Sequence, residues 1–400
     1  MQTPDTTLSV FLRSNELRTF CRQYGSETLS GLHQSFANTE RFSAIIAKQR
    51  ALVYPCGRQL SGIYHEIERD PTLKAYVRDI AENDHGTFVF CALDEQLQHL
   101  ASLESFEVDM SYKRVKGIFN EVIFARFVPE HGKVMTLLRV FTDQETTKGY
   151  EFLFARTFNL IKKYIGHDIK FHYLHGSGIK SIVCDMCPKQ MTGLGRVLQN
   201  TGRQDLGWRW HAMNILIFCK IHFTRTVYKL IPESGDPNDT TYHEARSRLL
   251  ALTECQTKAD YMKLTDLIKE HDPDLTGWVN HKQIDIIAAG LCNACSPIQS
   301  EFFEEARRHT NAVEQSHYKS YYMGTQDSLL QAVLKSYNPT RTIKKTKKKK
   351  QSNSFFTRPF NEQFGKRYNN TLFVTARISQ SSSYCIDKPS SAKPYYPCAR

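Results

Sequence analysis

Apolar and polar residues alternate in three short segments of the second quarter of the chain. The segments are 106–112 (FEVDMSY), 120–129 (NEVIFARFVP) and 133–142 (KVMTLLRVFT), and each has the length of a strand. The connections between them contain glycine, as turns between strands often do. The pattern therefore predicts an antiparallel meander of three strands.

A helix and two further strands are predicted after the meander. Residues 146–166 place apolar side chains at helical spacing and end on a glycine, which predicts one long helix. Residues 180–186 (KSIVCDM) and 214–223 (NILIFCKIHF) have strand character, and 192–202 between them favours a short helix. This order of elements predicts a mixed α/β fold, with helices packed on a mixed sheet.

The first hundred residues give a weaker, mostly helical signal. Asp70 and Pro71 favour a helix start, so the pattern predicts a helix over 69–83. A second helix is predicted over 94–103 (DEQLQHLASL).

The whole chain divides into five predicted regions. They are a mostly helical region at 1–100, a sheet core at 101–239 and 301–338, an all-helical insertion at 240–300, and a basic, disordered tail at 339–400.

The positive charge of the chain is concentrated near its C-terminus. The formal net charge is +12, and residues 341–400 carry fourteen Lys/Arg against two Asp/Glu. The other 340 residues are therefore neutral overall. The six-lysine run KKTKKKK (344–350) is typical of a nuclear import signal or a nonspecific DNA contact.

Cysteine usage and hydropathy indicate the compartment. The chain has eleven Cys, no recognisable secretory signal and no apolar run of membrane-spanning length. We therefore expect reduced thiols in a cytosolic or nuclear protein, with no membrane partner.

Three carboxylates form the candidate site. Asp109 lies on the first strand of the meander and Asp185 at the end of the fourth strand. In a sheet ordered 3-2-1-4 these strands are neighbours, so the carboxylates would repel each other unless a cation joined them. Two Mg²⁺ ions on such a pair suit phosphodiester chemistry, with Glu314 as a third ligand. The ordinary alternative is that an Asp at a strand end serves a turn or a cap.

Four segments together resemble one family of enzymes. FEVDMSYKR, IVCDMCPKQMTGLGRVL, CKIH and TNAVEQSHYKSYYMG resemble the Mutator-like element (MULE) transposases of fungal type, over roughly residues 100–335. The resemblance implies an RNase H-like core with an all-α insertion and a DDE triad of Asp109, Asp185 and Glu314 that binds Mg²⁺ or Mn²⁺. It also implies a nuclear enzyme, oligomeric when active, that cuts DNA at transposon ends and joins the freed 3′-hydroxyl to a target.

A zinc site competes with this interpretation. Cys184-x-x-Cys187 and Cys219-x-x-His222 have the ligand count of a Cys₃His zinc site. Neighbouring residues of a strand face opposite sides, however, so Cys184 and Asp185 would point apart. In the alternative, Cys184 is a core residue, and Cys219 and His222 orient the active site; the family carries a Cys-x-x-His element at this place.

Six residues are candidate DNA contacts, by charge or by base stacking: Lys113, Arg114, Lys189, Trp278, Lys347 and Lys348. A solvated strand edge or a core aromatic explains several of them nearly as well. Two alternatives for the whole chain stay open. One is a decayed or domesticated transposase that binds DNA without catalysis, and the other is a zinc-stabilised structural protein.

Overall fold

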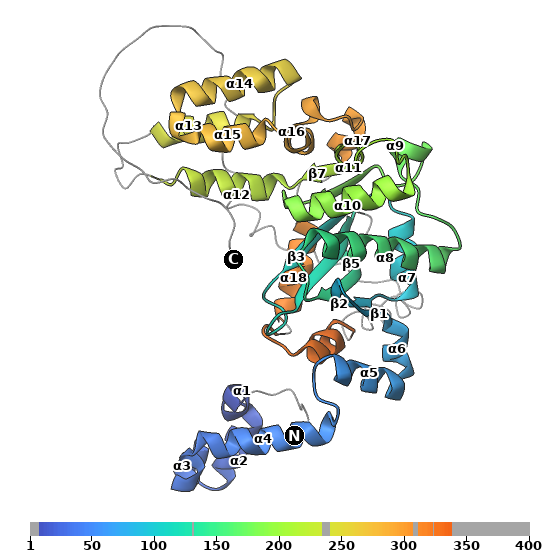
Figure 1. Cartoon of the computed structure of the whole chain (residues 1–400). Helices are drawn as coiled ribbons and strands as arrows, with labels where there is room; N and C mark the ends of the chain where they lie inside the picture. The colour runs from blue at the N-terminus through green and yellow to red at the C-terminus, as the bar shows by residue number, and fades with distance from the viewer. Residues whose placement is uncertain (1–7, 130–131, 234–240, 307–310, 323, 338–400) are drawn as a thin grey trace, which may run out of the picture. The chain divides into compact units, whose positions relative to one another are not determined.

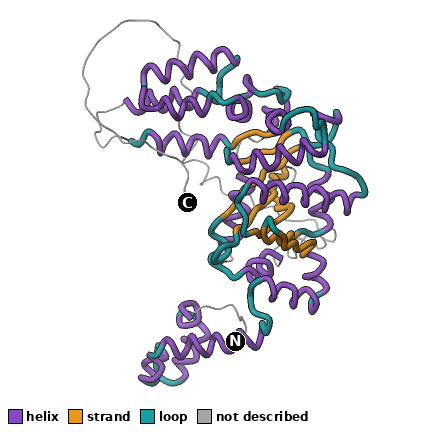
Figure 2. Tube along the Cα trace, in the orientation of Figure 1, coloured by secondary structure: helices purple, strands orange, loops and turns teal. Residues whose placement is uncertain are grey.

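A computed structural model describes residues 8–129, 132–233, 241–306, 311–322 and 324–337. Within these residues seven strands form one mixed sheet in the order β1-β2-β5-β4-β3-β6-β7, so the fold is mixed α/β. Figure 2 shows the strands gathered in one region, with helices around them. The strands are β1 (Val77–Asn83), β2 (Gly86–Cys91), β3 (Ser105–Ser111), β4 (Asn120–Val128), β5 (Lys133–Thr142), β6 (Ser181–Cys184) and β7 (Leu216–Phe218).

Helices make up most of the remaining described chain (Figure 1). A further helical segment at 329–337 follows the last of them. The helices are α1 (Leu8–Leu12), α2 (Asn15–Gln23), α3 (Leu29–Leu32), α4 (Thr39–Val53), α5 (Leu60–Arg69), α6 (Pro71–Tyr76), α7 (Asp94–Ala101), α8 (Thr147–Ile165), α9 (His172–His175), α10 (Pro188–Thr201), α11 (Trp208–Met213), α12 (Lys220–Leu230), α13 (Thr241–Ala251), α14 (Lys258–His271), α15 (Thr276–Lys282), α16 (Asp285–Leu291), α17 (Ser300–Glu305) and α18 (Asn311–Tyr322).

The predicted meander and the strand order 3-2-1-4 are confirmed. Strands β3, β4 and β5 pair antiparallel, while β6 pairs parallel with β3, and β7 parallel with β6. The long helix α8 ends at Gly166, which adopts a left-handed conformation with φ of 80°. A glycine tolerates this conformation at no steric cost, so the sequence signal for the helix end was sound.

The two faces of the sheet are covered differently. On one face, Phe106 and Val108 of β3 belong to the main hydrophobic core, which they share with α8 and α10. On the other face, Ile123 of β4 packs with Ala312 and Val313 at the start of α18. Because side chains alternate along a strand, the odd-numbered residues of β3 face α18.

Helix α18 is attached to β3 and to the loop that follows it. The buried Glu107 carboxylate accepts hydrogen bonds from the backbone N–H groups of Ala312 (2.7 Å) and Val313 (3.3 Å), and so caps the helix. Further along, the Ser111 hydroxyl is hydrogen-bonded to the Tyr321 hydroxyl. These contacts place one face of α18 directly over β3.

The predicted N-terminal boundary of the sheet is wrong. The helix expected over 69–83 ends at Tyr76, and Val77–Asn83 pairs with β2 instead. Leu73, Tyr76, Val77 and Ile80 imitate helical spacing, but the second half of the segment is held by strand pairing. The sheet therefore begins within the region that was expected to be mostly helical.

One smaller boundary also differs from the predictions. The fifth predicted strand, 214–223, is a strand only at Leu216–Phe218, because α12 already begins at Lys220. Between residues 240 and 300, α13 to α16 pack with α12 around Tyr261, Ile268 and Val279. The predicted basic tail at 339–400 lies outside the described residues.

No helix in the described part of the chain is both long and apolar enough to span a membrane.

The cap of α18 gives a first prediction. Glu107→Ala removes the acceptor of two backbone N–H groups at a buried helix start, so the free energy of unfolding should fall by about 2 kcal/mol. Urea unfolding measures this loss, and hydrogen exchange should accelerate in α18 before it does so elsewhere. As the control, Glu68→Ala on the exposed face of α5 should change stability by less than about 0.5 kcal/mol. Equal effects of the two substitutions would refute the capping role.

Candidate functional site

Asp109 and Asp185 lie at the same edge and on the same face of the sheet. In the parallel pair of β3 and β6, Glu107 is the partner of Val183. Two residues further along, the same register places Asp109 beside Asp185, directly after β6 ends. Because successive strand residues alternate faces, both carboxylates are on the α18 side.

The electrostatics of Asp109 agree with this proximity. Burial raises the pKa of Asp109 to about 6, and the negative charge of Asp185 contributes to the rise. His317 and His222 act in the opposite direction. The pair is thus self-repelling and depends on nearby positive charge.

Glu314 approaches the same place from α18. Its carboxylate forms a bidentate ion pair with Arg225 of α12, with N–O distances of 2.6 and 3.2 Å. The Nε2 atom of His222 lies 3.3 Å from the same carboxylate. The third carboxylate is therefore connected to the first two turns of α12, where Arg225 lies 89 residues away in sequence.

His222 lies between two of the three carboxylates. Its Nδ1 contacts the Asp185 carboxylate, while its Nε2 faces Glu314. Burial lowers the pKa of His222, but hydrogen bonds to Asp185 and Cys219 outweigh burial and raise it to about 10. The ring is therefore a cation at neutral pH, and it compensates the negative charge of the carboxylates.

Two sets of side chains at this site suit different metals. The oxygen ligands Asp109, Asp185 and Glu314 suit a hard cation such as Mg²⁺ or Mn²⁺. Among the described residues, one atom each of Asp185, Cys219 and His222 also lie within 4.8 Å of one another. This set of oxygen, sulfur and nitrogen suits Zn²⁺ or a similar transition metal. Both sets include Asp185, so the two kinds of metal would compete for it.

Cys184 does not fit the Cys₃His zinc site that the sequence left open as an alternative. Cys184 is fully buried in the main core on the opposite face of the sheet, and burial raises the pKa of its thiol. A thiol that is kept protonated in an apolar core is a poor ligand. The alternative interpretation, in which Cys184 is a core residue, describes the geometry, and His222 contacts Asp185.

A buried polar cluster lies directly behind Asp109, and sequence reasoning missed it. The Nε2 atom of His317 is 4.0 Å from Asp109, and its Nδ1 is 3.5 Å from Glu121 of β4. Glu121 pairs with Arg139 of β5 at 2.5 Å. Burial alone would raise the pKa of Glu121, but Arg139 and His317 lower it to about 2. The only sequence signal was polar residues in otherwise apolar strands.

The candidate phosphate contacts separate into two groups. Lys113 and Lys189 are exposed. The prediction for Arg114 is wrong, because its side chain is fully buried and pairs with Asp327 at 2.8 Å. A guanidinium held in this way supports the fold and is not accessible to a phosphate group.

The remaining candidate DNA contacts are Trp278, Lys347 and Lys348. Trp278 is half-buried in the core of the α12–α16 bundle, where its ring lies 5.9 Å from that of Phe223 and 5.0 Å from the Lys282 ammonium. It packs as a core aromatic does. Lys347 and Lys348 lie outside the described residues.

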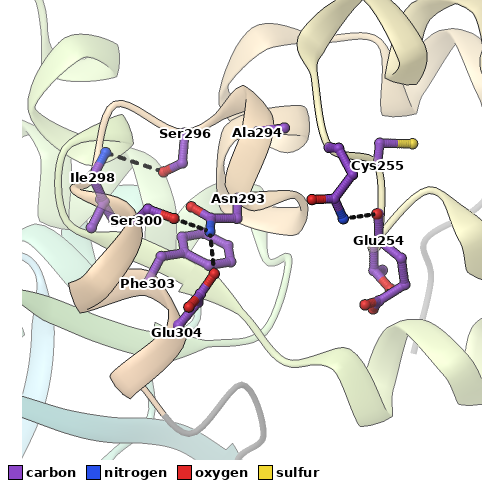
Figure 3. Close-up of a pocket in the computed structure, with 11 residues that line it drawn as sticks. Glu254, Cys255, Asn293, Ala294, Ser296, Ile298, Ser300, Phe303 and Glu304 are labelled. Carbon is purple, nitrogen blue, oxygen red and sulfur yellow. Dashed lines mark hydrogen bonds between the residues drawn. The ribbon is translucent and has the colours of Figure 1, made fainter.

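A cavity of about 440 Å³ is lined by residues 253–256, which lie between α13 and α14, and by residues between 293 and 304, which include part of α17. Figure 3 shows Asn293 at its wall, donating hydrogen bonds to Ser300 (2.7 Å) and Glu304 (3.3 Å). Glu254 lines the same cavity. None of the three candidate carboxylates is among its lining residues, and its acidic side chains do not favour a phosphate ligand.

Comparison with protein-family models finds no match for this sequence, and no curated protein matches it either.

The repulsion between the two Asp gives a second prediction. In EDTA at pH 8, Asp109→Asn should raise the melting temperature, with a gain in unfolding free energy of about 1–3 kcal/mol, because the folded protein disfavours the ionised Asp109. The pKa is raised on folding, so the gain should be complete above pH 6 and should vanish below pH 3.8, where Asp109 is protonated in both states. Thermal unfolding as a function of pH measures it. Asp168→Asn, at an exposed position, is the control; a wild-type protein as stable as Asp109→Asn at pH 8 would contradict the prediction.

Proposed function

We propose that this chain is a metal-dependent DDE transposase of the MULE type, acting on DNA in the nucleus. In this proposal the meander and the two parallel strands are an RNase H-like core, and residues 240–300 are its all-α insertion. The observation that carries the proposal is the register of β3 and β6, which sets Asp109 beside Asp185. The connection of Glu314 to Asp185 through His222 adds support.

The proposed reaction is hydrolysis of a phosphodiester followed by strand transfer. A water oxygen bonds to phosphorus, the bond from phosphorus to the 3′-oxygen breaks, and that oxygen takes up a proton. The freed 3′-hydroxyl then bonds to a phosphorus of the target, and the bond from that phosphorus to the target's 3′-oxygen breaks. The hydroxyl loses its proton, and the departing 3′-oxygen takes one up. Divalent ions bound by Asp109, Asp185 and Glu314 would activate the attacking oxygen and stabilise charge on the leaving one.

Other side chains of the site position these carboxylates. His222 contacts Asp185, and Arg225 donates hydrogen bonds to both carboxylate oxygens of Glu314. The Nε2 atom of His317 lies 4.0 Å from the Asp109 carboxylate. Preorganised carboxylates of this kind are what transfer of a phosphoryl group requires, because the chemistry depends on position and charge.

A second candidate is a zinc-stabilised protein that binds without catalysis. The cluster of Asp185, Cys219 and His222 favours it. The two candidates differ in whether they need Asp109 and Glu314. These two carboxylates belong to the set of oxygen ligands and not to the cluster of Asp185, Cys219 and His222. Metal analysis of the purified chain, with and without a chelator, distinguishes them together with the activity assay below.

The proposal predicts metal-dependent nicking of supercoiled plasmid by the full chain. Asp185→Asn should reduce the rate at least a hundredfold, because Asn keeps the shape but removes a charge that the ions need. Adding Asp109→Asn to it should cost little more, since the carboxylates act as a unit. EDTA should abolish nicking, and Mg²⁺ or Mn²⁺ should restore it.

The matched control is Asp168→Asn, which changes an exposed carboxylate that is paired with Lys162 outside the site. Its rate should equal that of the wild type. If Asp185→Asn nicks as fast as the wild type, or if EDTA has no effect, the protein does not act through these carboxylates.

A further inference from the structure

The β3–β4 loop (residues 112–119) begins three residues after Asp109 and is firmly attached to the chain beyond α18. The backbone N–H of Lys116 donates to the carbonyl of Asp327 at 2.7 Å. Two further backbone hydrogen bonds, from Gln326 to Lys113 and from Asp327 to Arg114, are each 3.1 Å long. The loop is therefore held like a short strand rather than projecting freely.

Burial of Arg114 determines which residues of the loop face the solvent. Its guanidinium is fully buried and donates to the Ser320 carbonyl (2.9 Å) and the Asp327 carboxylate (2.8 Å). Val115 beside it is also buried, at 2% exposure. With these two side chains directed inward, the side chains on either side of them are exposed.

The exposed residues share a chemistry that suits a nucleic acid. Tyr112 is 59% exposed and Ile118 is 70% exposed, while Lys113 and Lys116 are both exposed. The loop contains no Asp or Glu. A flat ring with two cations beside it matches a base with its flanking phosphates.

Tyr112 comes directly after β3, three residues beyond Asp109. Burial of its phenol raises the pKa of Tyr112 to about 12, and Glu145, Cys187, Asp109 and Asp185 add to the rise. More than half of the Tyr112 residue is nevertheless in contact with solvent. A nucleotide next to a phosphodiester bound by Asp109 and Asp185 would lie within reach of this ring.

We propose that the β3–β4 loop binds DNA next to the scissile phosphate, with Tyr112 stacking on an unpaired base and Lys113 and Lys116 contacting phosphates. This inference rests on the proposed function, because it assumes that DNA occupies the carboxylate site. Opening of the duplex at that site would expose such a base. The surface fits DNA better than an apolar protein partner, because two of its four exposed side chains are cationic and it borders the carboxylates.

Binding is measured in EDTA, where it does not depend on catalysis. The probe is a short duplex with a single-stranded extension that contains 2-aminopurine, whose fluorescence is quenched when it stacks on an aromatic ring. Wild-type protein should quench the probe. Tyr112→Ala should lose the quenching and bind about tenfold more weakly by fluorescence anisotropy, while Tyr112→Phe should keep both properties. A fully paired duplex should show a smaller loss.

Matched controls test the specificity of the effect. Tyr24→Ala removes an equally exposed tyrosine on the N-terminal helices and should change nothing. The pair Lys113→Gln with Lys116→Gln should lower the slope of log affinity against log salt by about 1.5–2, whereas Lys48→Gln with Lys74→Gln should leave it unchanged. If Tyr112→Ala unfolds at a lower temperature, Tyr112→Leu, which fills the same space without a ring, replaces it.

The outcomes separate this inference from the proposed function. Quenching and affinity that survive in Tyr112→Ala or Tyr112→Leu would overturn the inference and assign the surface to another partner, even if Asp185→Asn abolishes nicking. Loss of quenching in these variants, with nicking unaffected in Asp185→Asn, would support the DNA surface and overturn the catalytic proposal.

Discussion

The attachment of helix α18 to strand β3 determines the geometry of the whole site. Glu107 caps the start of the helix, while Ser111 and Arg114 bond to Tyr321 and Ser320 near its end. The same strand carries Asp109 and the same helix carries Glu314. A single set of contacts therefore fixes two carboxylates, relative to each other and to the sheet. Any change that loosens α18 should disturb the site before it disturbs the core on the opposite face.

Placing three carboxylates together requires positive charge nearby, and two helices place basic side chains against them. His222 and Arg225 come from α12, and His317 comes from α18 itself. Each contacts a carboxylate of the site, so the repulsion between Asp109 and Asp185 is partly compensated. The arrangement also limits side-chain freedom, because each carboxylate has a partner that restricts its rotation. Charge compensation and preorganisation are thus achieved by the same contacts.

The sequence predicted the parts of this arrangement that leave a periodic signal. The alternation of apolar and polar residues in β3, β4 and β5 predicted a sheet with covered faces. Asp109 was visible within this pattern as a charged residue. The strand at Val77–Asn83 was missed because Tyr76, Val77 and Ile80 imitate a helix, and only pairing with β2 decides between the two structures. The role of Arg114 could not be predicted, since a lysine- and arginine-rich loop looks solvated until its partner Asp327, 213 residues away, is known. Long-range polar contacts of this kind have no local pattern.

The protonation state of His222 affects both sets of candidate metal ligands. As a cation, the imidazole compensates Asp185 and Glu314 but has no free lone pair for a metal. Binding of a transition metal by Asp185, Cys219 and His222 therefore requires loss of that proton, and the raised pKa of His222 makes this loss costly at neutral pH. A hard cation on the carboxylates needs no ligand from the ring, although it does need the ring's charge to move aside or be neutralised. Under the proposed function, the environment of one histidine would thus influence which metal the site accepts.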